Sequence, residues 1–84
     1  MGQNIKTSKA QIVERKLGRE KAFGQYFDGV VEIDPRLDSF NYLDTLIHEM
    51  LHHHFPDASE AQVTEIPTKM ATQIWRKDYR KLAK

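Results

Sequence analysis

The sequence predicts an α+β fold, in which a three-stranded antiparallel meander is followed by two helices packed on one face of the sheet. Three observations support this class. Polar and apolar residues alternate, as they do along half-buried strands, in three early segments: residues 11–17, 21–27 and 30–34. Asp28-Gly29 lies between the last two segments and indicates a two-residue hairpin turn. In the second half of the chain, apolar residues recur at steps of three and four, as on one face of a helix.

The three strands are expected to be joined by two tight turns. Gly18-Arg19 separates the first segment from the second, and the Asp28-Gly29 hairpin separates the second from the third. In the third segment Val31 and Ile33 alternate with Glu32 and Asp34. The two apolar residues should therefore face the core, and the two acidic residues should face away from it.

Local signals set the ends of the two helices. Pro35 stops the third strand, and Asp38 or Ser39 can cap the first helix. Ser59 and Gln62 have the spacing of a capping box at the start of the second helix. The apolar face of the first helix has six members: Phe40, Leu43, Ile47, Met50, Leu51 and His54.

Pro67 lies inside the apolar stripe of the second helix, because that stripe is formed by Val63, Ile66, Met70 and Ile74. A proline in a helix lacks one N–H donor and clashes with the preceding turn. The second helix should therefore kink or restart at Pro67.

Composition limits what the chain can be. Its 84 residues suit one domain, spanning residues 1–84. There is no cysteine, so any metal would take its ligands from His, Asp or Glu. No apolar run reaches the length of a membrane helix, and no signal-peptide stretch opens the sequence. We therefore expect a cytoplasmic protein that does not contact a membrane.

Charge is unevenly distributed along the chain. Residues 28–65 hold nine acidic and one basic side chain, whereas residues 1–27 and 66–84 are basic. An acidic middle suits a divalent cation and a basic substrate, and the basic ends suit an anionic partner. The simpler interpretation is that these charges are solvated surface.

The motif that carries chemistry is His48-Glu49-Met50-Leu51-His52, which has the H-E-x-x-H pattern. Histidines four residues apart lie on the same face of a helix, where both imidazoles can bind one ion. Zinc brings the pKa of a bound water towards neutrality, and Glu49 is placed to take the proton as the water attacks a carbonyl. We therefore predict Zn²⁺ as the cofactor, with His48 and His52 as ligands and Glu49 as the catalytic base.

The helical phase adds detail. At about 100° per residue, His48 and His52 fall at the rim of the apolar face, and Glu49 falls beyond them. A catalytic zinc needs a third protein ligand, and the possible donors are Asp57, Glu60 and Glu65. The phase of the second helix turns Glu60 towards the first helix and Glu65 towards solvent. We predict Glu60 as the third ligand and keep Asp57 as the reserve.

Other polar residues have open roles. His54 lies on the apolar face and is expected to be packed and hydrogen-bonded, whereas His53 points away and fits plain surface. A donor to the transition-state oxyanion is also needed. Five residues are chemically able to supply it, and the sequence does not choose among them: Tyr26, Tyr42, Tyr79, His53 and Arg76.

The stretch from Gly24 to Asp34, followed by LDTLIHEMLHHHFPD and SEAQV, resembles compact zincin-type metallopeptidases. It is similar to the small phage and bacterial proteins near the SprT-like and minimal gluzincin domains, over roughly residues 20–80. The resemblance implies a sheet whose edge strand pairs with an extended substrate, an active-site helix, and a second helix that bears a glutamate ligand. Glu60 stands at the position of that glutamate.

Two functions follow. The first is a zinc metallopeptidase that hydrolyses peptide bonds in a peptide or protein substrate. The second is a non-catalytic zinc-binding interaction module, whose basic C-terminal segment would contact nucleic acid or an acidic protein. That segment contains five cations: Arg76, Lys77, Arg80, Lys81 and Lys84. Retention of Glu49 favours the first function, because a structural site has no use for a carboxylate that does not bind the metal.

Overall fold

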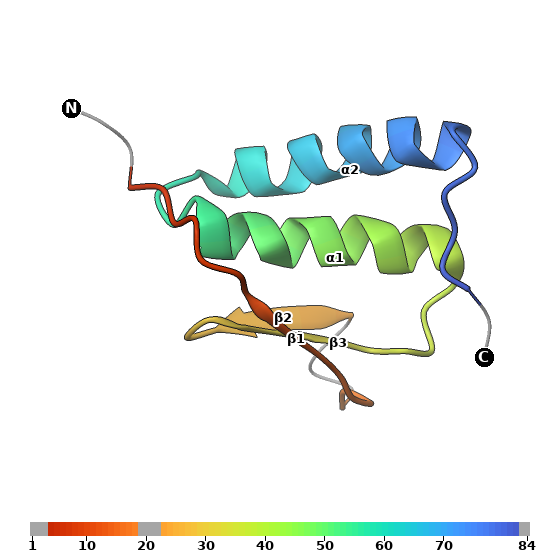
Figure 1. The fold of residues 1–84 in the computed structure, drawn as a ribbon, viewed down its shortest axis with the longest axis horizontal. Coiled ribbons are helices and arrows are strands. Elements are labelled where there is room, and N and C mark those ends of the chain that lie inside the picture. Colours follow the sequence, from red (N-terminus) through yellow and green to blue (C-terminus); the bar gives the residue numbers. More distant parts are fainter. Residues whose placement is uncertain (1–3, 19–22, 83–84) are drawn as a thin grey trace.

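A computed structural model describes residues 4–18 and 23–82. Three strands, β1 (Gln11–Glu14), β2 (Gly24–Phe27) and β3 (Val30–Ile33), precede two helices, α1 (Ser39–His54) and α2 (Glu60–Arg76). The predicted α+β class is confirmed, and both helices lie on the same side of the sheet (Figure 1). The α1 helix packs against β2, β3 and α2, whereas α2 packs on α1 alone among these elements. The molecule therefore has three layers, with α1 in the middle.

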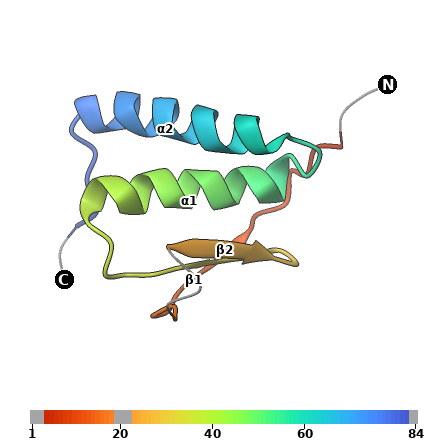
Figure 2. The same ribbon diagram turned by 180° about the vertical axis from the view of Figure 1, so that it is seen from behind.

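The sheet differs from the predicted meander. Its strand order is β1-β3-β2, with β1 parallel to β3 and β2 antiparallel to β3. The β2–β3 connection is a tight turn, as predicted, whereas Arg19 of the other predicted turn lies outside the described residues. A hairpin pairs neighbouring strands, but the longer β1–β2 connection leaves β3 free to lie between them. The β2 strand is therefore an edge strand of the sheet, and it lies in front in the view of Figure 2.

The β2–β3 hairpin matches the sequence signal. Asp28 and Gly29 both have positive φ values, 52° and 84°, as a type I′ turn requires. Val31 and Ile33 are 0% exposed and face α1, as predicted. Asp34 was expected to face solvent, but it is buried, because its carboxylate accepts hydrogen bonds from the Arg36 side chain and the Leu17 N–H.

Each helix begins at the predicted cap. The Asp38 side chain accepts a hydrogen bond from the Asn41 N–H at 2.9 Å, so Asp38 rather than Ser39 caps α1. Ser59 and Gln62 form the capping box of α2. None of the helices within residues 4–18 and 23–82 is long and apolar enough to cross a membrane.

The α2 helix runs as one element through Pro67, so the restart predicted as one possibility there does not occur. Its fully buried residues are Val63, Pro67 and Ala71, which lie one turn apart on the side facing α1. Ile66 and Met70, predicted in the stripe, are about two-fifths exposed, at 42% and 40%. The buried stripe is therefore rotated slightly from the predicted one, and the small Ala71 allows close packing on α1.

Candidate metal centre

The middle position of α1 creates the site. A helix between a sheet and a second helix buries two faces, and a narrow polar strip remains between them. His48 and His52 lie on this strip, half-buried and one turn apart, with ring centroids 5.0 Å apart. Their rings are inclined by 75°, so the two imidazoles do not stack on each other.

Glu49 completes a compact donor group with the two histidines. One imidazole nitrogen from each of His48 and His52 and one oxygen of Glu49 lie within 4.8 Å of one another. Two ligands of a tetrahedral zinc lie roughly 3.4 Å apart, given zinc–ligand bonds of about 2.0–2.1 Å. Small side-chain rotations therefore bring the imidazoles to binding distance. Two imidazoles with a carboxylate form a donor set that suits Zn²⁺.

Glu49 is more buried than the sequence predicted. Helical phase placed Glu49 beyond the two histidines, away from the apolar face of the helix. In the structure this residue is only 7% exposed, because the sheet covers that side of α1. Gly24 of β2 makes this approach possible. A Cβ at Gly24 would lie 2.8 Å from Thr45 Cγ2, 2.9 Å from Glu32 O and 3.5 Å from Glu49 Cγ. The carboxylate of Glu49 thus leaves α1 directly beside the β2 backbone.

Burial changes the proton affinity of the site. It raises the pKa of Glu49 above its ordinary value, with a further rise from the charge of Glu60 and an opposing effect from His48. Burial lowers the pKa of His52, because it disfavours the charged imidazolium. The charge of His48 lowers this pKa further, and the charge of Glu60 acts in the opposite direction. His52 therefore stays neutral to lower pH, which is the form that binds a metal.

The structure separates the three possible third ligands. Glu60, the first residue of α2, lies outside the 4.8 Å group, but its charge acts on both Glu49 and His52. Asp57 and Glu65 are exposed, and neither is among the causes of the pKa shifts of Glu49 and His52. Of the three, Glu60 is therefore the carboxylate whose charge acts on His52 and Glu49.

His53 is the clearest departure from the sequence-based interpretation. Expected at the surface, it is 4% exposed. Its Nε2 donates to the Ser8 carbonyl at 2.9 Å, so its Nδ1 accepts from the Tyr26 hydroxyl at 2.8 Å. His54 is hydrogen-bonded as predicted, through its Nδ1 to the Lys6 carbonyl at 2.7 Å. Both side chains therefore anchor the N-terminal segment to the end of α1.

The proposed oxyanion donors do not converge on the site. Tyr26 and His53 bond to each other, and the Tyr42 hydroxyl donates to Glu14. Tyr79 and Arg76 are exposed and lie towards or beyond the far end of α2. None of these five residues lines the cleft that adjoins His48 and Glu49.

That cleft, about 270 Å³, is bounded by β2, α1 and α2. Besides His48 and Glu49, it is lined by residues that sequence reasoning missed: Phe23, Gly24, Asp44, Thr45, Thr64 and Thr68. Their spacing held a signal. Asp44 and Thr45 precede His48 and Glu49 by one helical turn each, so they share their faces of α1. The threonines bring hydroxyl groups to the side of the cleft that α2 forms.

Comparisons with protein-family models, with curated proteins and with solved structures find no match for this chain. The functional interpretation therefore rests on the residues of the site and their geometry.

Proposed function

We propose that this chain is a zinc-dependent metallopeptidase of minimal, SprT-like zincin type that hydrolyses peptide bonds. The observation that carries the proposal is the position of Glu49, buried between the β2 backbone and two imidazoles that can share one ion. Among the described residues this carboxylate makes no hydrogen bond of its own, so it is available as a base. We also propose that the protein acts in the cytoplasm, as expected from the sequence.

In this proposal His48 and His52 hold the zinc ion, and Glu60 supplies the third ligand. Glu60 has to approach by rotation of its side chain, which its exposed position in the first turn of α2 permits. Bound zinc would polarise the substrate carbonyl and make the attacking water more acidic.

Glu49 moves the proton. Its raised pKa brings the carboxylate closer to the working pH of a general base. As a water oxygen bonds to the carbonyl carbon, Glu49 takes one water proton. When the C–N bond breaks, Glu49 passes that proton to the leaving amine, so a carboxylic acid and a neutral amine are formed and Glu49 returns to its starting state. The acid then transfers its remaining proton to the amine or to water.

The outer edge of β2 suits an extended substrate. The Phe23 carbonyl accepts a hydrogen bond from the Asp34 N–H at 3.0 Å. Gln25, two residues further along the chain, pairs with Glu32 of β3. In an antiparallel ladder the alternate residues, here Gly24 and Tyr26, then direct their N–H and C=O groups to the opposite edge. A peptide that pairs with this edge passes the cleft beside Glu49.

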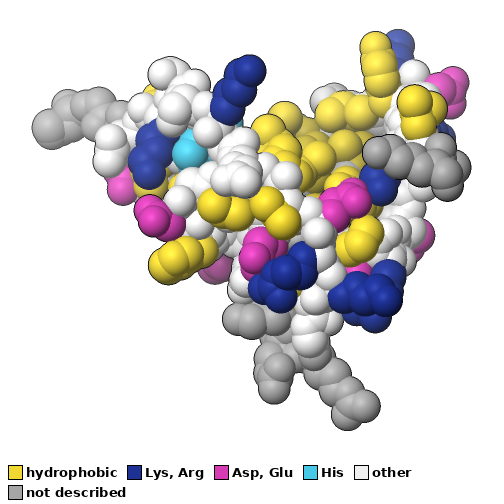
Figure 3. All heavy atoms as spheres, turned by 60° about the horizontal axis from the view of Figure 1, so that its bottom comes forward, with side chains coloured by type: hydrophobic (Ala, Val, Ile, Leu, Met, Phe, Trp, Pro, Cys, Tyr) yellow, Lys and Arg dark blue, Asp and Glu magenta, His cyan; other side chains and the backbone are white. Residues whose placement is uncertain are grey.

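The alternative, a non-catalytic module with a basic tail, has less support. Arg80 stacks over the Trp75 ring at 3.4 Å and donates to the Trp75 carbonyl, and Lys81 pairs with Glu14 at 3.1 Å. These cations are therefore partly engaged within the chain. On the face shown in Figure 3, acidic and basic side chains are interspersed with apolar ones, so this face is not uniformly basic.

The test is the Glu49→Gln variant. An amide cannot accept the proton, so peptide hydrolysis should fall by at least about a hundredfold. The fold and zinc binding should be kept, as measured by circular dichroism and metal analysis. His48→Ala serves as the contrasting variant and should lose both the metal and hydrolysis.

The substrates should be unfolded or flexible proteins, which can form an extended strand. Hydrolysis that persists in Glu49→Gln would assign the base to another residue or the activity to a contaminant. A wild-type protein that binds zinc but cleaves none of a broad peptide library would favour the non-catalytic module.

A further inference from the structure

We infer that the cleft beside Glu49 binds the side chain of a lysine or arginine of the substrate, with Asp44 as the partner of that cation. The inference rests on the proposed function, because it names the substrate class of the same site. It assigns a specificity role to a residue that neither binds the metal nor moves the proton.

Asp44 is placed to act on a substrate held at the centre. It lies one turn before His48 on α1, and its half-buried side chain lines the cleft together with His48 and Glu49. One helical turn is about 5.4 Å, and alternate residues of an extended peptide are roughly 6.8 Å apart. A substrate side chain within two residues of the scissile bond can therefore reach Asp44.

The Asp44 carboxylate has capacity left for a cation. Both of its oxygens lie 3.2 Å from the Thr68 hydroxyl, which has one proton to donate and so satisfies one oxygen at a time. None of the ion pairs found within residues 4–18 and 23–82 includes Asp44. A half-buried carboxylate without a cation gains from a charged donor more than from a neutral one.

The walls of the cleft fit the rest of such a side chain. Phe23 is 50% exposed and lines the cleft, so its ring can cover the methylene groups of a lysine or arginine. Thr64 adds a hydroxyl group that can accept from an ammonium or guanidinium. Among the lining residues that the structure describes, two are carboxylates, Asp44 and Glu49, and none is a lysine or arginine. Glu60 would offset part of the charge of a bound dication, and Asp44 keeps a negative charge within the cleft whether or not Glu49 is ionised.

Binding measurements on the zinc-loaded Glu49→Gln protein test the inference without any need for turnover. The probes are labelled, otherwise neutral peptides in which one lysine is moved through successive positions, each compared with the same peptide carrying glutamine. At the position whose side chain enters the cleft, the lysine peptide should bind about tenfold more tightly than the glutamine peptide. Added salt should reduce this difference.

Asp44→Asn should remove this preference, because the amide keeps an acceptor for Thr68 but carries no charge. Glu65→Gln is the matched control. It removes the same charge from the exposed side of α2 and should leave the ratio unchanged. Melting curves of both variants establish that the fold is kept.

Equal binding of lysine and glutamine peptides at every position, or a preference that survives Asp44→Asn, would overturn the inference. The same is true if no peptide binds. Failure of the proposed function has a different signature, namely no zinc uptake or no hydrolysis by the wild-type protein. The ratio of the affinities for the lysine and glutamine peptides therefore tests the role of Asp44 separately from the catalytic proposal.

Discussion

Single residues show how strongly neighbours set chemical character in this small domain. Glu49 and Glu65 are both helical glutamates, yet Glu65 is exposed, whereas Glu49 is buried and its pKa is raised by that burial. Glu60 is exposed, but its charge affects both Glu49 and His52. A carboxylate at this place, at the start of a helix, also has a simple structural benefit from the helix dipole. Its role as a metal ligand therefore needs a direct test.

Glu60→Ala should weaken zinc binding by at least about tenfold, whereas Glu65→Ala should leave it unchanged, because Glu65 points away from α1. Competition with a chromophoric chelator measures both affinities. The zinc-free melting temperatures of the two variants give the control for helix-dipole effects. Similar losses from both variants would show that the electrostatic proximity of Glu60 does not reflect ligation.

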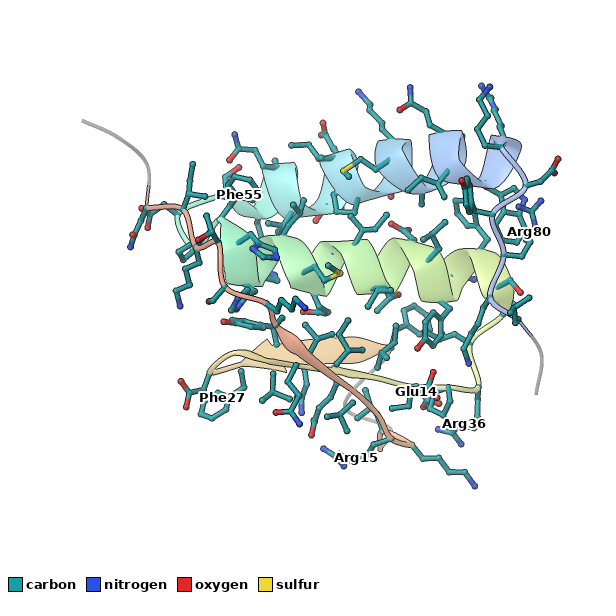
Figure 4. All side chains as sticks on the ribbon, viewed as in Figure 1. Glu14, Arg15, Phe27, Arg36, Phe55 and Arg80 are labelled. Atoms are coloured by element: carbon teal, nitrogen blue, oxygen red, sulfur yellow. The ribbon has the colours of Figure 1, made fainter. Side chains whose placement is uncertain are left out.

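At the scale of elements, the contact between α1 and β2 determines the geometry of the site. Gly24 lies against Thr45 and Glu49 of α1, and its missing side chain lets Glu49 lie beside the strand. The opposite face of the sheet plays no part in this contact. Arg15 and Phe27 project from this face, away from the helices (Figure 4). Figure 4 also shows Phe55 near the start of α2 and Arg80 beyond its end. Phe27 is 76% exposed there.

Gly24→Ala should move α1 away from β2, because the new methyl group would meet Thr45 and the Glu32 carbonyl. We expect a stability loss of about 1–3 kcal/mol and a weaker zinc affinity. Denaturant unfolding and zinc titration measure the two effects. Gly29→Ala is the control: its φ of 84° makes alanine costly, but nothing lies within 4 Å of the added group. It should lower stability and leave zinc affinity intact.

At the scale of the whole molecule, the core is small. Among the described residues, its largest fully buried side chains are those of Val31, Ile33, Val63 and Pro67, and no disulfide can support them because the chain has no cysteine. Small domains often gain stability from a bound metal. Here the proposed ligands come from α1 and α2, so zinc would link the middle layer of the three-layer structure to the outer helix.

Zinc should therefore raise the melting temperature. Free zinc at about a hundred times its dissociation constant adds about 2.7 kcal/mol, which corresponds to roughly 10 °C or more in a domain of this size. Differential scanning fluorimetry with zinc and then with a chelator measures this gain. An unchanged melting curve, together with unchanged histidine ring signals in NMR spectra, would contradict the metal site.

The zinc-free protein has its own pH dependence. Burial lowers the pKa of His52 in the folded state, so the unfolded chain binds its proton more readily. This contribution to stability is present above the usual histidine value of 6.5 and is lost as pH falls through the lower folded pKa. The gain from zinc should decline over the same acidic range, because the imidazoles must be neutral to bind it.

Local patterns in the sequence were enough to predict several features. The Asp28-Gly29 turn, the Asp38 and Ser59 caps and the α1 helix that carries His48 and His52 depend on neighbours within a few residues, and all agree with the structure. The zinc, the activity and the zincin resemblance remain predictions. Their support is the donor group that this short-range spacing brings together.

Long-range packing decided the rest. The position of β3 between β1 and β2 depends on pairing between distant segments, which alternation within a strand does not specify. The burial of Glu49 and His53 follows from the position of α1 between the sheet and α2, whereas helical phase alone assumes one buried face. The cleft that joins Asp44 to Thr68 exists only where two helices meet, so no single stretch of sequence describes it.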